Sequence, residues 1–99
     1  MARKGGTNTD QTKEGVAAGG AWLKETRKAA GLTQFAMGKA LDFDYFTHVS
    51  QIEGGRSRLQ TANYRKWAEM VGMDSQQFTR KLLSFYEPDL YDLLFEDGE

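Results

Sequence analysis

Only a few side chains in this sequence could take part in chemistry, and several of them lie close together. His48 is the only histidine, and the sequence contains no cysteine. Without a cysteine or a second histidine, the sequence offers no set of ligands typical of a protein zinc site. Ser50 lies two residues after His48, and residues two apart on a helix do not face each other. We therefore expect no catalytic residue, no metal site and no cofactor.

The polar side chains around His48 are better suited to hydrogen bonding. Thr47, Ser50 and Gln51 carry hydroxyl and amide groups that can form hydrogen bonds with the edges of DNA bases. On a helix these three residues lie on the face opposite the apolar residues Val49 and Ile52. Gln51 has the geometry for a bidentate pair with adenine. The spacing thus predicts a helix with a buried apolar face and an outer polar face.

The segment that contains this helix has the pattern of a helix-turn-helix. Thr33 is the expected N-cap of a helix over 34–41, and a turn leads into the next helix, which ends at about Glu53. A helix-turn-helix places its second helix in the major groove of DNA. The turn lacks a glycine, so we expect Asp42 or Asp44 to adopt the left-handed conformation, which Asp tolerates.

Helical periodicity continues on both sides of this motif. One helix is predicted from about Ala21 to Gly31, and others over 61–71, 76–86 and 88–95. No stretch alternates between apolar and polar residues as a strand does. The predicted fold class is all-α, a compact bundle of about five helices followed by a short C-terminal helix.

We expect three regions along the 99 residues. Residues 1–20 contain five glycines and Val16 as the only sizeable apolar residue after the first, which predicts a flexible N-terminal arm. Residues 21–73 form the predicted helix-turn-helix core, and residues 74–99 form a helical extension with an acidic tail. No apolar run approaches the roughly 20 residues that a bilayer requires. No signal peptide is evident, so a cytoplasmic protein without membrane contact is expected.

Charge is distributed unevenly along the chain. The formal net charge is −1, but residues 87–99 contain six acidic residues and no basic one. Residues 1–86 contain thirteen basic residues against eight acidic ones, a net charge of +5. This asymmetry favours a nucleic-acid-binding body with an acidic tail held away from the nucleic acid. The alternative, that the basic residues only solvate the surface, stays open at this point.

Two stretches of the sequence resemble the phage repressor/Cro family, also called XRE-type helix-turn-helix proteins. They are residues 22–34 (Trp-Leu-Lys-Glu-Thr-Arg-Lys-Ala-Ala-Gly-Leu-Thr-Gln) and residues 49–56 (Val-Ser-Gln-Ile-Glu-Gly-Gly-Arg). The resemblance covers about residues 21–73. It implies a lambda-repressor-like DNA-binding fold, and members of this family usually bind palindromic operators as dimers.

The resemblance also implies roles for individual residues. Those implied to contact base edges are Phe46, Thr47, Ser50 and Gln51. Those predicted to contact phosphates are Gln34, Tyr45, His48, Arg56 and Arg58. Arg27 and Glu53 match an ion pair that joins the first and third helices. Phe46 cannot form a hydrogen bond through its side chain, so packing on a thymine methyl group and covering the core both remain open.

The C-terminal region contains more apolar residues than one side of a helix can hold. A single core buries one side of a helix, so the surplus suggests a second layer of helices or a symmetric dimer contact. The residues predicted at the dimer interface are Leu83, Tyr86, Leu90, Tyr91, Leu94 and Phe95. The expected partners are double-stranded DNA and a second copy of the chain. Another protein bound by the C-terminal helices is the alternative that stays open.

Taken together, these patterns predict a sequence-specific DNA-binding regulator of transcription. The small size and the lack of a sensor domain favour a simple repressor. Two alternatives remain open from the sequence. One is an antitoxin-like protein whose acidic, apolar C-terminal region binds a basic toxin. The other is an adaptor that contacts the transcription machinery without reading DNA.

Overall fold

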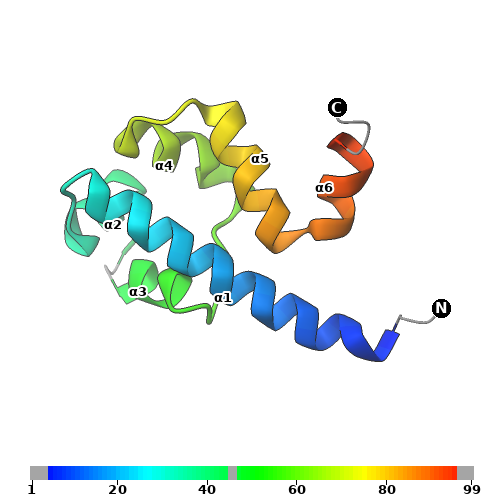
Figure 1. Ribbon diagram of the computed structural model, residues 1–99. Coiled ribbons are helices and arrows are strands. Elements are labelled where there is room, and N and C mark those ends of the chain that lie inside the picture. Colours follow the sequence, from blue (N-terminus) through cyan, green and yellow to red (C-terminus); the bar gives the residue numbers. More distant parts are fainter. Residues whose placement is uncertain (1–4, 45–46, 96–99) are drawn as a thin grey trace.

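The computed structural model describes residues 5–44 and 47–95, and gives only the backbone course for residues 5–11. Over these ranges the protein is all-α without a strand, as predicted. The helices are α1 (Gly5–Ala29), α2 (Gln34–Ala40), α3 (Thr47–Glu53), the short 3-10 helix η1 (Thr61–Asn63), α4 (Tyr64–Val71), α5 (Ser75–Tyr86) and α6 (Pro88–Phe95) (Figure 1). Tyr45 and Phe46, which were predicted to contact DNA, lie outside the described residues.

Local sequence signals account for most of the helix ends. Thr33 caps α2, because its hydroxyl oxygen accepts a hydrogen bond from the Ala36 amide at 3.0 Å. Asp42 adopts the left-handed conformation in the turn that follows, with φ of 65°. The N-cap of α5 is Asp74, whose carboxylate accepts from the Gln77 amide at 3.0 Å. The helix therefore starts one residue earlier than the sequence pattern predicts.

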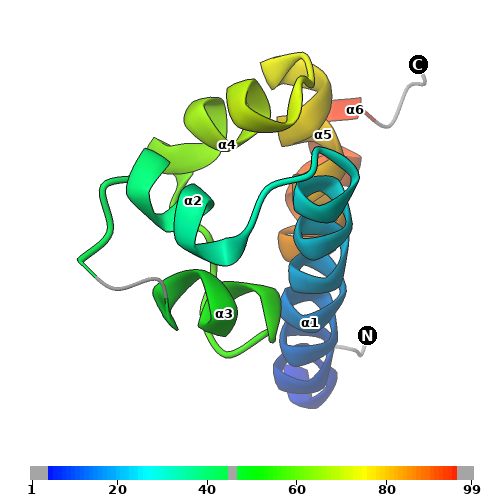
Figure 2. The ribbon, with the colours of Figure 1, turned by 90° about the vertical axis from the view of Figure 1, so that its left-hand side faces the viewer.

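The core lies where α1, α3, α4 and α5 meet, with α2 closing one end (Figure 2). The largest fully buried side chains come from each of these helices: Trp67, Phe78, Leu23, Met37, Ile52, Leu82 and Val49. Trp67 also donates a hydrogen bond from Nε1 to the hydroxyl oxygen of Thr26 at 3.0 Å, which connects α4 to α1. The short α3 thus packs through Val49 and Ile52 on a core to which all of these helices contribute, which fixes its orientation.

The prediction of a flexible arm over residues 1–20 is wrong for residues 5–20, which form the first part of α1. Val16 is buried, and so are Gly19 and Gly20. A Cβ atom at Gly19 would lie 2.6 Å from Cε1 of Tyr86, and one at Gly15 would collide with the backbone carbonyl of Phe85. These glycines therefore let α1 approach α5 closely. Residues 1–4 are outside the described part of the chain.

The prediction that Tyr86 lies at a dimer interface is also wrong. Its side chain is 4% exposed and belongs to the core of the single chain. Its hydroxyl oxygen accepts a hydrogen bond from the Leu59 amide at 3.0 Å. Tyr86 therefore anchors the loop between α3 and η1 to the end of α5, and it is not available to a partner.

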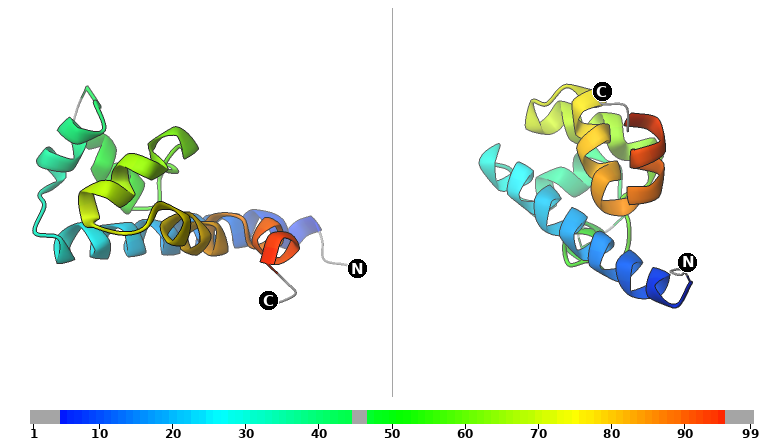
Figure 3. Two further views of the ribbon diagram at one scale, coloured as in Figure 1. Left: turned by 90° about the horizontal axis from the view of Figure 1, so that it is seen from above. Right: turned by 45° about the vertical axis from the view of Figure 1, so that its right-hand side comes forward.

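The last helix, α6, packs mainly on α5 and lies at the opposite end of the molecule from α2 and α3 (Figure 3). The molecule is elongated, with principal extents of 44 × 29 × 21 Å. The acidic residues of α6, Asp89 and Asp92, are consequently remote from α3, whereas Glu87 contacts Arg58 in the loop that follows α3. None of the described helices is both long and apolar enough to cross a membrane.

Candidate nucleic-acid interface

The outer face of α3 carries the polar residues that the spacing placed there. Thr47, Ser50 and Gln51 are exposed, whereas Val49 and Ile52 beneath them are 0% and 1% exposed. A helix of this kind is held by its apolar side and presents hydrogen-bonding groups on the other. The predicted position of Gln51, Thr47 and Ser50 on an accessible helix face is therefore confirmed.

An open hollow of about 510 Å³ lies between the turn and the first residues of α3. It is lined by Asp42, Phe43, Asp44, Thr47, His48 and Gln51. The His48 ring stacks on the Phe43 ring, with centroids 4.2 Å apart and planes inclined by 24°. The stack fixes His48 on the rim although its side chain is exposed. The two aspartates make this rim acidic, so it is a poor place for phosphate contacts.

Sequence analysis did not assign a role to Phe43, Asp42 or Asp44 in this surface. Phe43 lies five residues before His48, on the other side of the turn, so helical spacing cannot bring the two rings together. Only the path of the turn does so. Among the described residues, no three His, Cys, Asp or Glu side chains gather in a way that could hold a metal ion.

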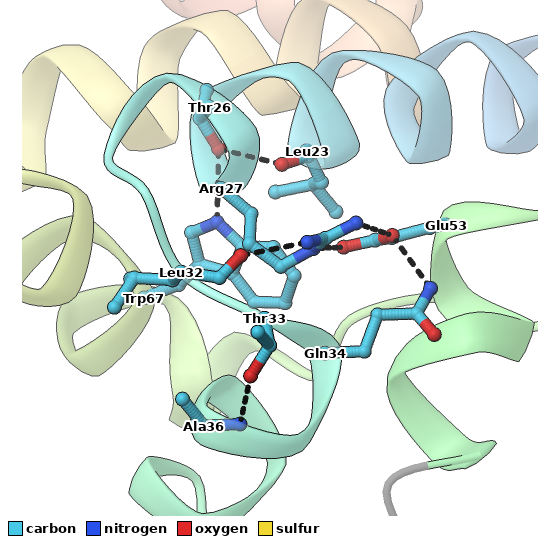
Figure 4. A network of polar contacts seen from close by, with 9 residues as sticks. All are labelled: Leu23, Thr26, Arg27, Leu32, Thr33, Gln34, Ala36, Glu53 and Trp67. Atoms are coloured by element: carbon cyan, nitrogen blue, oxygen red, sulfur yellow. Dashed lines mark hydrogen bonds and ion pairs between the residues drawn. The ribbon is translucent and has the colours of Figure 1, made fainter.

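A network of buried polar contacts holds the end of α3 from behind (Figure 4). Nε of Arg27 donates to Oε2 of Glu53 at 2.6 Å, and its Nη2 donates to Oε1 at 3.0 Å. Nη1 of Arg27 donates to the Leu32 carbonyl at 2.7 Å. The two side chains are 9% and 2% exposed. The ion pair implied by the family resemblance is therefore present, and it joins α1, the loop before α2 and α3.

Gln34 is part of the same network. Its Nε2 donates to Oε1 of Glu53 at 3.0 Å, so one amide N–H is used inside the protein. An amide nitrogen has two N–H donors, and the second remains for another acceptor. Gln34 is partly exposed at the start of α2. The geometry thus allows Gln34 to hold Glu53 and a phosphate at the same time, and the phosphate contact stays a prediction.

The two arginines that follow α3 are in different environments. Arg56 is exposed, and its backbone amide donates to the Gln51 carbonyl at 2.9 Å. Arg58 is half-buried, and its guanidinium donates to Oε2 of Glu87 at 2.8 Å and to the Tyr86 carbonyl at 2.6 Å. The guanidinium also lies over the Tyr86 ring, 5.0 Å from its centroid. Two of its five N–H donors are thus used at the end of α5, and its side chain is 39% exposed. The phosphate contact of Arg58 stays a prediction.

Two tyrosines, Tyr64 and Tyr86, are buried near the loop that follows α3. Burial raises the pKa of Tyr64, and the neighbouring Tyr86 hydroxyl raises it further. Burial also raises the pKa of Tyr86, although the hydrogen bond from Leu59 and the charge of Arg58 act in the opposite direction. Both phenols therefore stay neutral through the physiological range and serve as structural hydrogen-bonding groups.

The backbone of α1 also lies very close to the backbone at the end of α3, which adds to the support of α3. A Cβ atom at Gly20 would lie 2.6 Å from the Glu53 carbonyl oxygen and would also collide with that of Ile52. Gly55 has φ of 79°, and a Cβ there would lie 2.8 Å from Cα of Ala17. Sequence analysis missed Gly20 as a site-positioning residue. The signal was present, because residues 16, 19, 20, 23 and 27 continue one helical stripe towards the N-terminus.

A scan against models of known protein families found no match to this sequence, and neither did a search of curated proteins. The functional argument therefore depends on the residues and geometry described above.

Proposed function

We propose that this protein is a sequence-specific DNA-binding regulator of transcription, of the phage repressor/Cro type, that acts in the cytoplasm as a homodimer on a two-fold operator. The observation that carries the proposal is the exposed row of Thr47, Ser50 and Gln51 on a helix whose other face is buried. Polar side chains on an accessible, firmly supported helix are what major-groove reading requires.

In the proposed complex, α3 lies in the major groove. Gln51 pairs with an adenine through N6 and N7, and Thr47 contacts a neighbouring base or a thymine methyl group. Arg56 and the remaining N–H of Gln34 bind phosphates, which adds affinity and sets the register without reading sequence. The buried ion pair of Arg27 and Glu53 keeps α3 at a fixed angle, so binding requires little ordering of the protein.

The rest of the chain is compatible with this arrangement. The acidic residues of α6 lie at the far end, where they do not oppose the phosphates (Figure 3). A homodimer would place two α3 helices in half-sites about one helical turn, ~34 Å, apart. Occupying a promoter in this way would block transcription directly, as a simple repressor does.

The experiment is selection of bound sequences from a random duplex library, followed by affinity measurements on the selected site. Gln51→Ala is expected to weaken binding to the selected site by about 1–3 kcal/mol and to relax preference at one base pair per half-site. Gln77→Ala, the same change at an exposed position of α5, serves as the matched control and should leave affinity and preference unchanged. Equal loss of affinity on selected and scrambled duplexes would argue against Gln51 as a base-reading residue.

A second candidate is a protein that binds a different protein through α6. The observation that favours it is the exposure of Leu93 and Leu94, at 73% and 58%. An antitoxin-like protein or an adaptor would use such a surface for its partner. Co-purification of a second protein that is lost on Leu93→Asp, together with no selected duplex, would support this candidate over the first.

A further inference from the structure

Three of the four exposed large hydrophobic side chains of the described residues lie on the eight-residue helix α6. Leu90, Leu93 and Leu94 are 42%, 73% and 58% exposed. The same helix carries the exposed carboxylates Asp89 and Asp92 and no basic residue. We call these five residues the acidic ridge. A row of leucines in water indicates a contact surface, and the carboxylates make DNA an unsuitable partner for it.

Next to the ridge is a groove of about 600 Å³ between α4, α5 and α6. Its lining residues are Thr61, Ala62, Tyr64, Arg65, Ser75, Gln76, Thr79, Arg80, Leu83, Leu94 and Phe95. Two arginines and no carboxylate face this groove. The guanidinium of Arg80 lies 4.4 Å from the centroid of the Phe95 ring, which holds it at the groove edge. We call this feature the basic groove.

The ridge and the groove are complementary in both polarity and charge. The ridge offers leucines flanked by carboxylates, and the groove offers an apolar floor flanked by Arg65 and Arg80. The two features are adjacent, and Leu94 belongs to both. A two-fold interface requires such a self-complementary patch, since each copy contributes the same surface to the other. The chain therefore carries both halves of one interface.

We propose that the acidic ridge of one copy occupies the basic groove of a second copy. A two-fold axis repeats the contact, so that the ridge of the second copy occupies the groove of the first. The inference deepens the proposed function, on which it rests for the expectation that two copies act together on an operator. It removes Tyr86 from the predicted interface and adds Leu93 and Arg65. Because α6 is remote from α3, the contact leaves both α3 helices accessible.

The experiment measures self-association without DNA, by sedimentation velocity over a range of concentrations. The groove variant is Arg65→Glu, and the ridge variant combines Asp89→Lys with Asp92→Lys. Each variant alone should associate at least about tenfold more weakly than the unmodified chain, since like charges then face each other. These residues are exposed, so circular dichroism should show an unchanged fold.

The decisive measurement is an equimolar mixture of the two variants. In a mixed pair, the introduced glutamate faces the introduced lysines at one contact, and the original charges face each other at the second contact. The mixture should therefore regain association to within about threefold of the unmodified chain. Lys24→Glu, a charge reversal on the exposed side of α1, is the control and should change nothing.

Three outcomes would overturn the inference. One is a mixture that associates no better than either variant alone. Another is an unmodified chain that stays monomeric at concentrations at which it fills its operator, which leaves the proposed DNA binding intact. The third is a monomeric chain that forms a complex with a different protein through the same leucines. A different result would separate the two proposals. If each variant associates weakly, their mixture recovers association, and the chain selects no DNA sequence, the inference is upheld and the proposed function is refuted.

Discussion

The two ends of this molecule differ in how far their apolar side chains are buried. At one end, the short α3 buries Val49 and Ile52 completely and is held by an ion pair, by Gln34 and by the close approach of α1. At the other end, α6 leaves Leu90, Leu93 and Leu94 in solvent and packs mainly on one neighbouring helix. The difference agrees with the two proposals. A helix that reads a DNA groove benefits from firm support, and a helix that buries its leucines in a second copy does not need them in its own core.

The largest expected effect is at the supported end, on breaking the buried ion pair. Arg27→Ala leaves the carboxylate of Glu53 buried without a counter-charge, and we expect a loss of about 3–5 kcal/mol in the free energy of unfolding. Chemical denaturation measures this loss. The double variant Arg27→Met with Glu53→Leu removes both charges and should recover most of the stability. If Arg27→Ala lost less free energy of unfolding than the double variant, the ion pair would not be buried as described.

A smaller effect at the same end is expected from Gly20→Ala. Alanine in a helix is favoured over glycine by about 1 kcal/mol, so the substitution would stabilise an exposed site. At Gly20 the new Cβ meets the carbonyl oxygens of Ile52 and Glu53, which cannot move without shifting α3. We expect net destabilisation of about 1–3 kcal/mol, measured by thermal unfolding. Ala21→Leu, next to it on the exposed side of α1, is the control and should be neutral.

The smallest effect is expected at the α6 end. Leu93→Ser should change the free energy of unfolding of the monomer by no more than about 0.5 kcal/mol, because the side chain is already in water. Leu82→Ala, on the neighbouring α5, should cost about 2–5 kcal/mol, because Leu82 is 0% exposed. Denaturation of dilute protein compares the two. A large loss for Leu93→Ser would mean that α6 is part of the core rather than a contact surface.

Local signals in the sequence predict the helices and the outer face of α3 well. Thr33 caps α2, Gly31 and Gly72 adopt left-handed conformations at helix ends, and α6 spans the residues that were predicted. Each of these features depends on interactions within a few residues. For the same reason, the position of Thr47, Ser50 and Gln51 on one exposed face follows from spacing alone.

Several features that depend on distant residues were not predicted, although the Arg27–Glu53 ion pair, which the family resemblance implied, is present. Gly15, Gly19 and Gly20 looked like a flexible segment, since nothing nearby shows which backbone comes close to them. The contact of Arg58 with Glu87 was not predicted either, because Glu87 lies 29 residues further along the chain. In each case the role of the residue is set by an element that is remote in sequence.

By itself, therefore, the sequence determined that the chain is helical, where most helices end, and which side of α3 is polar. These properties come from backbone preferences and from the period of the helix, which act locally. Only the tertiary structure decided that the N-terminal glycines lie under α3 and α5, that Tyr86 is a core residue, and that the leucines of α6 stay exposed beside a groove lined by arginines. Those properties depend on which helix surfaces pack against each other, and this packing involves helices that are distant in the sequence.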